Sequence, residues 1–121
     1  MNRYCFTIRV RPDRLDEYRR RHDRVWPEML HALRETGWTN YSLFLNDEGL
    51  LIGYVESDDI HASLARMAET EINQRWQLEM SPFFASIDGA PDDNFTFIPE
   101  VFHLEDQIAA LGLSGQEDSQ Q

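Results

Sequence analysis

Apolar and polar side chains alternate along four stretches of the chain, which predicts four β-strands. In residues 3–10, "RYCFTIRV", one face of the expected strand carries Tyr4, Phe6, Ile8 and Val10. Residues 38–46 and 50–56 follow the same pattern, and the "NDEG" between them predicts a hairpin. The last strand is expected over residues 95–104, where Pro99 favours a sheet edge or a bulge because it lacks an N–H.

Helical patterns fill the two long intervals between these strands. The first helix is expected to start at about Asp13 and to end at Gly37. Pro27 lies inside this helix, so we expect a kink or a restart there. The second helix is expected to bend near Thr70 and to end at Pro82. Turn residues and acids then fill residues 86–94, which predicts a loop.

The order β-α-β-β-α-β predicts an α+β protein with a ferredoxin-like βαββαβ fold, a four-stranded antiparallel sheet with two helices on one face. We expect one such domain over residues 1–104. Residues 105–121 are expected to form a short helix followed by a polar, disordered tail. The second sheet face stays uncovered, so we expect a homodimer that stacks sheet on sheet. The strands are expected to supply more apolar surface than two helices can cover. The residues that supply it are Tyr4, Phe6, Ile8, Leu43 or Phe44, and Ile52 or Tyr54.

Composition restricts the class of partner. The chain has 121 residues, 41% of them hydrophobic, and a net charge of −11, which argues against nucleic acid or an anionic membrane as a partner. A basic cluster around Arg19 and Arg21 is interrupted by acids and is interpreted as a solvated, salt-bridged helix face. No apolar run is long enough to cross a membrane, and no signal-peptide pattern opens the chain. The expected location is therefore the cytoplasm.

The chain lacks the residues that several kinds of catalytic and cofactor chemistry require. All eleven basic residues are arginine, so no lysine can form a Schiff base. Cys5 is the single cysteine and lies in a strand-like run, where packing is its expected role. No histidine pair has metal-ligand spacing, and neither a nucleophile elbow nor a glycine-rich phosphate loop is present. We therefore expect no metal and no cofactor.

The candidate chemistry lies in the run "EYRRRHDRVWPE", residues 17–28. Tyr18, His22 and Trp26 recur at steps of four, which places them on one helix face. Each residue also has an ordinary structural explanation: a surface histidine, a core tryptophan or a packed tyrosine. Their combination with other polar and aromatic residues instead suits a neutral carbohydrate, because aromatic faces stack on sugar C–H surfaces. The other residues of this set are Asn40, Tyr41, Asn73, Trp76 and Gln77.

The chain resembles the L-rhamnose mutarotase family, sugar 1-epimerases that form dimeric α+β barrels. The segments that carry the resemblance are "EYRRRHDRVWPEM", "NYSLFLND", "QRWQLEM" and "PEVFHL", within residues 3–104. The resemblance implies cofactor-free interconversion of α and β anomers, with His22 catalytic and Tyr18, Tyr41 and Trp76 in contact with the sugar. The family carries two successive tryptophans where this chain has Trp76 and Gln77, so Gln77 replaces one aromatic wall and leaves the sugar's identity open.

A mutarotase opens the sugar ring by removing a proton from the anomeric hydroxyl and delivering one to the ring oxygen. One imidazole can serve one of these roles, while a phenol, a carboxylate or water serves the other. Two alternatives remain open at this point. One is a cofactor-independent oxygenase or decarboxylase of a small aromatic on the same fold, and the other is a non-catalytic ligand-binding dimer module.

Overall fold

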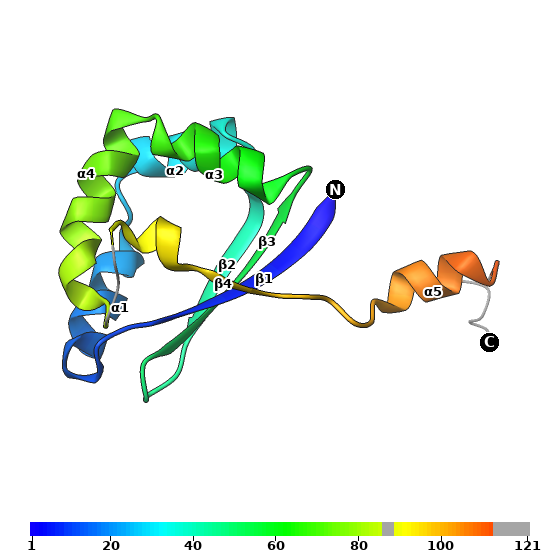
Figure 1. Cartoon of the computed structure of the whole chain (residues 1–121), viewed down its shortest axis with the longest axis horizontal. Helices are drawn as coiled ribbons and strands as arrows, with labels where there is room; N and C mark the ends of the chain where they lie inside the picture. The colour runs from blue at the N-terminus through cyan, green and yellow to red at the C-terminus, as the bar shows by residue number, and fades with distance from the viewer. Residues whose placement is uncertain (86–88, 113–121) are drawn as a thin grey trace.

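The protein is a four-stranded antiparallel sheet with short helices packed on one face (Figure 1). The computed structural model describes residues 1–85 and 89–112. The strands lie in the order β2-β3-β1-β4, and each neighbouring pair is antiparallel. Their bounds are β1 (Asn2–Arg9), β2 (Thr39–Leu45), β3 (Leu50–Ser57) and β4 (Thr96–Ile98). This topology confirms the predicted ferredoxin-like α+β fold.

Each crossover between strands consists of two short helices. The helices of the crossovers are α1 (Leu15–Asp23), α2 (Pro27–Glu35), α3 (Ile60–Ala68) and α4 (Glu71–Met80). A further helix, α5 (Leu104–Ala110), follows the sheet and lies away from it in Figure 1. Single 3-10 turns cover Pro12–Arg14, Ser81–Phe83 and Pro91–Asn94. No helix in the described part of the chain combines the length and the apolar character needed to cross a bilayer.

The predicted helix breaks at Pro27 and Thr70 are confirmed. Pro27 is the first residue of α2, and Trp26 before it is extended, with φ −54° and ψ 134°. Thr70 is the N-cap of α4, and its hydroxyl accepts a hydrogen bond from the backbone N–H of Asn73 at 3.2 Å. These breaks turn the chain, and residues of α1 and α4 line one cavity with the sheet.

The apolar face of β1 packs under the helices, which corrects the expectation that its residues contribute to the open face. Phe6 and Ile8 are buried on the helix side, and Tyr4 and Leu43 pack against the same core. Alternation determines which residues share a face of a strand, but the path of the crossover helices decides which face they cover. The open face instead carries Phe44, Ile52, Tyr54 and Ile98, which occupy neighbouring positions in the strand register.

The last strand is shorter than predicted. β4 pairs with β1 over only three residues, Thr96–Ile98, whereas residues 95–104 were expected to be strand. Pro99 follows directly and has no N–H to continue the ladder, so pairing stops there. The prediction that Pro99 places this strand at an edge is confirmed, since β4 is the outermost strand beside β1. The short helix expected from Glu105 is also present, as α5. The polar tail falls outside the described residues from residue 113 on.

The basic cluster on α1 is neutralised by ion pairs. Arg19 contacts Asp47 at 3.1 Å, and Arg21 contacts Glu79 at 2.8 Å. These side chains are exposed, so each pair contributes little to stability. The pairs confirm the interpretation of a solvated, salt-bridged helix face.

The Phe6 ring packs directly against Gly53 at the base of the core, where the core meets the sheet. The two residues face each other across β1 and β3, and a Cβ on Gly53 would overlap the Phe6 ring. On its other side Phe6 stacks on Phe95, with ring centroids 3.9 Å apart. A glycine is therefore required at position 53 by the volume of the phenyl ring.

We expect Gly53→Ala to destabilise the fold by about 1–3 kcal/mol, because the added methyl group overpacks the core. Thermal unfolding measures the effect. Phe6→Leu should relieve the overlap, so the double variant Phe6→Leu/Gly53→Ala should lose less stability than the sum of its single variants. Additive losses would show that the Phe6 ring does not set the requirement for glycine.

Candidate active site

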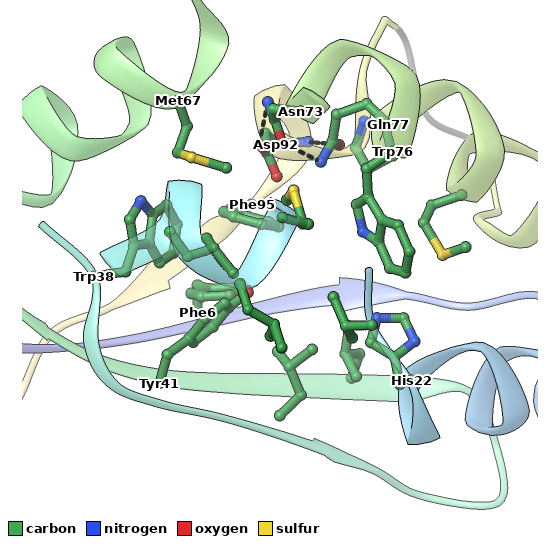
Figure 2. A pocket seen from close by; sticks show the side chains of 18 of the residues that line it. Phe6, His22, Trp38, Tyr41, Met67, Asn73, Trp76, Gln77, Asp92 and Phe95 are labelled. Carbon is green, nitrogen blue, oxygen red and sulfur yellow. Dashed lines mark hydrogen bonds between the residues drawn. The ribbon is translucent and has the colours of Figure 1, made fainter. Parts of the chain in front are cut away.

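A cavity of about 330 Å³ lies between the sheet and the helices (Figure 2). Its size is that of a small-molecule site. The sheet contributes aromatic and aliphatic side chains, while α1 and α4 contribute the polar groups. On α4 the lining residues recur at helical spacing along one face, namely Asn73, Trp76, Gln77 and Met80.

His22 is held against Tyr18, one helical turn earlier on α1. The two rings stack with centroids 4.2 Å apart, and His22 Nδ1 lies 3.0 Å from the carbonyl oxygen of Tyr18. A carbonyl can only accept, so Nδ1 carries the hydrogen and donates it. Burial lowers the pKa of His22, and the hydrogen bond to Tyr18 opposes this shift in part. At neutral pH the ring is therefore uncharged, and Nε2 is its proton acceptor.

Two tryptophans form the wall beside His22. The His22 and Trp76 rings form a T-shaped pair, with centroids 5.6 Å apart and planes at 82°. Trp26 packs against the far side of Trp76, with centroids 4.9 Å apart and planes at 84°. Trp76 is buried and lines the pocket, whereas Trp26 supports it from behind. The Tyr-His-Trp run of the sequence thus contributes two lining residues and one supporting residue.

Tyr41 and Trp38 form the opposite end of the pocket, away from His22 in Figure 2. Their rings are 4.8 Å apart, and Tyr41 also lies 6.2 Å from the Phe6 ring. The indole N–H of Trp38 is buried and has no hydrogen-bond partner among residues 1–85 and 89–112.

Three polar side chains close a ring of hydrogen bonds on the α4 side. Gln77 Nε2 donates to Asn73 Oδ1 at 3.0 Å, and Asn73 Nδ2 donates to Asp92 Oδ2 at 3.4 Å. The backbone N–H of Asp92 donates to Gln77 Oε1 at 3.2 Å and completes the ring. Both ends of each amide are engaged, which fixes their orientation. The ring holds Asp92 at the pocket wall (Figure 2).

The pocket contains groups with strongly shifted proton affinities. Burial raises the pKa of Asp92 to about 6, and the bond from Asn73 opposes this shift. Burial also raises the pKa of the Tyr18 and Tyr41 phenols, and the Asp92 charge adds to both shifts. The phenols therefore keep their protons at neutral pH, whereas Asp92 can gain or lose one.

The structure brings all five predicted site residues to one pocket. His22, Tyr18, Tyr41, Trp76 and Gln77 line it together, and their roles toward a sugar remain proposals. Gln77 reaches the pocket beside Trp76 because the cavity extends around this corner of α4.

Two residues fall outside the sequence-based expectations for this pocket. Asn40 is exposed and donates to Glu56 Oε2 at 3.2 Å, away from the cavity. Asp92 lines the cavity and was not anticipated. It lies in "GAPDDN", where turn residues and acids look alike, and nothing in that run separates the pocket-lining Asp92 from its exposed neighbour Asp93. The clustering of Asn73 and Gln77 one turn apart was the only signal that a polar partner was needed.

None of the described residues forms a group of three or more His, Cys, Asp or Glu that could hold a metal ion.

The fold and the pocket together define an α+β protein of the ferredoxin-like type, with a half-buried imidazole in an aromatic cavity of small-molecule size. The family model described as L-rhamnose mutarotase matches residues 3–104. The chain belongs to the L-rhamnose mutarotase family.

Relatives in sequence agree with this assignment, and solved structures share the fold. An L-rhamnose mutarotase of Oceanobacillus iheyensis is 41% identical over 107 residues, covering 87% of this chain and 100% of the relative. One of Bacillus subtilis is 38% identical over 112 residues, with the same coverage of 87% and 100%. The crystal structure of an L-rhamnose mutarotase from Formosa agariphila has a TM-score of 0.70 and 24% identity, covering 85% of this chain and 98% of that one. An antibiotic biosynthesis monooxygenase has a TM-score of 0.54 and 18% identity over 84% and 100% of the chains, and shares the fold alone.

We expect Asp92→Asn to stabilise the protein above pH 7 by about 2 kcal/mol. The folded pKa of Asp92 is raised from 3.8 to about 6, so the folded state binds its proton more tightly than the unfolded state does. The stability that this contributes is complete below pH 4 and is lost as the pH rises through 6. Thermal unfolding at pH 7.5 and at pH 4 checks the sign: the variant should gain at the higher pH only.

Asp93→Asn is the matched control, because Asp93 is exposed and adjacent. It should change stability by less than about 0.5 kcal/mol. An equal loss of stability for Asp92→Asn at both pH values would contradict the burial of an ionised carboxylate.

Proposed function

We propose that this protein interconverts the α and β anomers of L-rhamnose, with His22 transferring the proton of the anomeric hydroxyl. Family membership supports the reaction. The structural observation that carries the assignment is the neutral imidazole of His22, oriented by the Tyr18 carbonyl in an aromatic pocket. The protein is thus an isomerase, of the epimerase type that acts on carbohydrates.

The chemistry needs little more than proton transfer. Removal of the anomeric proton and protonation of the ring oxygen open the hemiacetal to an aldehyde. Rotation about C1–C2 presents the other carbonyl face, and closure gives the second anomer. His22 Nε2 is suited to accept the hydroxyl proton, because its lone pair is free when Nδ1 donates to Tyr18.

The aromatic wall suits the remainder of the sugar. We place the sugar against Trp76, whose indole offers a flat apolar surface for ring C–H groups and the C6 methyl. Tyr18 and Tyr41 keep their phenolic protons and can donate hydrogen bonds to hydroxyls. Gln77 contributes an amide at the same wall. The proposed substrate-binding residues are therefore Tyr18, Tyr41, Trp76 and Gln77.

The alternative of an oxygenase or decarboxylase of a small aromatic rests on the aromatic lining alone. The likeness to a monooxygenase structure concerns the fold, at 18% identity. The oriented imidazole and the amide groups have a direct use in opening a hemiacetal, so mutarotation is the better supported function.

A cytoplasmic location stays a prediction.

We expect His22→Ala to reduce the rate of anomer exchange of L-rhamnose by about 10²–10⁴-fold, because it removes the proton acceptor. Saturation-difference NMR of the two anomeric protons measures this rate without any coupling enzyme. His31→Ala is the matched control: His31 lies on α2 with an exposed side chain and should leave the rate unchanged. If the wild-type protein exchanges the anomers no faster than buffer does, the proposed function is wrong.

We further propose that the protein is a homodimer joined through the open sheet face. Phe44, Ile52 and Ile98 on this face are 58%, 36% and 48% exposed. Val101 and Phe102, in the segment after β4, are 95% and 59% exposed. Apolar side chains gathered on one face favour burial against a partner, and a second copy offers the same surface by two-fold symmetry.

We expect Ile52→Glu to convert the dimer to a monomer, because it places a charge at the centre of the open face. Sedimentation velocity at micromolar concentration measures the change. Leu78→Glu is the control, since Leu78 is 76% exposed on α4, on the helix side of the sheet. A monomeric wild-type protein, or dissociation by Leu78→Glu as well, would argue against an interface on the open face.

A further inference from the structure

The reaction needs a second proton-transfer group, and Asp92 is the pocket residue placed to supply it. We propose that Asp92 works opposite His22, exchanging a proton with the ring oxygen while His22 exchanges one with the anomeric oxygen. This inference rests on the proposed mutarotation. It concerns a residue that the Tyr-His-Trp run and the tryptophan wall do not include.

The first support is the identity of the groups that line the pocket. Among the described lining residues the titratable ones are Tyr18, His22, Tyr41 and Asp92. His22 takes the accepting role, because its Nδ1 hydrogen is committed to the Tyr18 carbonyl. The pKa values of the two phenols lie further from neutral pH than that of Asp92, so the phenols are less well matched to proton exchange there. Asp92, with a pKa of about 6, is the remaining proton donor.

The second support is geometric. Figure 2 shows Asp92 and His22 on different walls of the cavity, with open space between them. Asp92 lies close enough to Tyr18 and Tyr41 for its charge to shift both phenols, so it faces the interior. The proposal places the two oxygens attached to C1 between these walls, with O1 toward His22 and O5 toward Asp92.

The third support is the hydrogen-bond ring that positions the carboxyl. Asn73 donates to Asp92 Oδ2, and Gln77 accepts from the Asp92 backbone N–H. The bond between Gln77 and Asn73 closes the ring and leaves neither amide free to rotate. Asn73 is 3% exposed, and polar side chains are seldom buried this deeply without a specific partner. Asn73 and Gln77 are therefore positioning residues for Asp92.

The proposed steps balance in protons and electrons. His22 Nε2 takes the proton of the anomeric hydroxyl, the C1–O5 bond breaks with its electron pair on O5, and protonated Asp92 gives its proton to O5. After rotation about C1–C2, the O5 hydroxyl attacks the other face of C1 and returns its proton to the Asp92 carboxylate. The imidazolium then returns its proton to O1. Both side chains end as they began, with one proton shared by the pair.

This scheme gives a bell-shaped pH dependence, because the productive pair carries one proton. Protonation of His22 removes the acceptor at low pH, and ionisation of Asp92 removes the donor at high pH. The groups that face Asp92 are Tyr18 from α1, Tyr41 from β2, the two amides of α4 and the neighbouring Asp93. The phenols stay neutral through this range, so the two limbs belong to His22 and Asp92.

The test compares Asp92→Asn with Asp93→Asn in the full chain, with L-rhamnose as the probe. Anomer exchange is measured by saturation-difference NMR from pH 5 to pH 8 and corrected for the buffer rate. We expect Asp92→Asn to lower the rate about 10²-fold or more while L-rhamnose binding stays within about threefold. The alkaline limb should disappear, leaving a rate that only rises with pH as His22 becomes neutral. Asp93→Asn removes the same charge from an exposed position and should retain the rate and both limbs, with the alkaline limb moved slightly to lower pH because the Asp93 charge raises the pKa of Asp92.

Two results would overturn the inference alone, with the wild-type protein active. One is an Asp92→Asn rate equal to that of Asp93→Asn. The other is a lower rate with the alkaline limb intact, which would mean that Asp92 only supports the pocket wall. A wild-type protein that exchanges anomers no faster than buffer would overturn the proposed function, and this inference with it. The expected gain in thermal stability of Asp92→Asn above pH 7 separates a chemical loss from a failure to fold.

Discussion

The hydrogen bond from the His22 ring to the Tyr18 carbonyl is the contact that gives the pocket its chemistry. It decides which ring nitrogen keeps the hydrogen, and therefore which one can accept a proton from a substrate. The same contact depends on α1 being regular between these residues, so that the carbonyl of one turn lies beside the ring of the next. Stacking on Tyr18 and the contact with Trp76 then shield the imidazole in part from water, and this burial lowers its pKa.

The main features of the fold could be predicted from local signals. Pro27 cannot donate a helix hydrogen bond and Thr70 is a good N-cap, so both breaks in the crossovers follow from the chemistry of single residues. The length of β4 and the covered face of β1 could not be predicted in this way. The apolar pattern continues beyond Ile98 although pairing with β1 stops at Pro99, and the covered face depends on the path of helices that are distant in the chain.

The candidate site also contains some residues that could be predicted from local signals and some that could not. The spacing of Tyr18, His22 and Trp26 at steps of four makes them visible as a set, and the structure places the first two in the pocket. The prediction that all three share one helix face is wrong for Trp26, because α1 ends at Asp23 and Trp26 is extended. Asp92 reaches the pocket from a segment with no periodicity, beyond a different helix. Its partners on α4 are amides whose purpose is apparent only when the carboxyl is in place. Periodic elements can thus be interpreted from the sequence, whereas a single residue from a loop needs the tertiary structure.

The hydrogen-bond ring of Asn73, Gln77 and Asp92 offers a physical explanation for the departure from the family pattern at Gln77. An amide has both a donor and an acceptor, and Gln77 uses one toward Asn73 and the other toward the Asp92 backbone. An indole has a single N–H and no acceptor, so a tryptophan at this position could not accept from the Asp92 N–H. In this chain, the amide of Gln77 therefore replaces the second aromatic residue of the wall and helps to position the Asp92 carboxyl. The change at position 77 therefore bears on how the proton-transfer groups are held, as well as on which sugar surface the pocket meets.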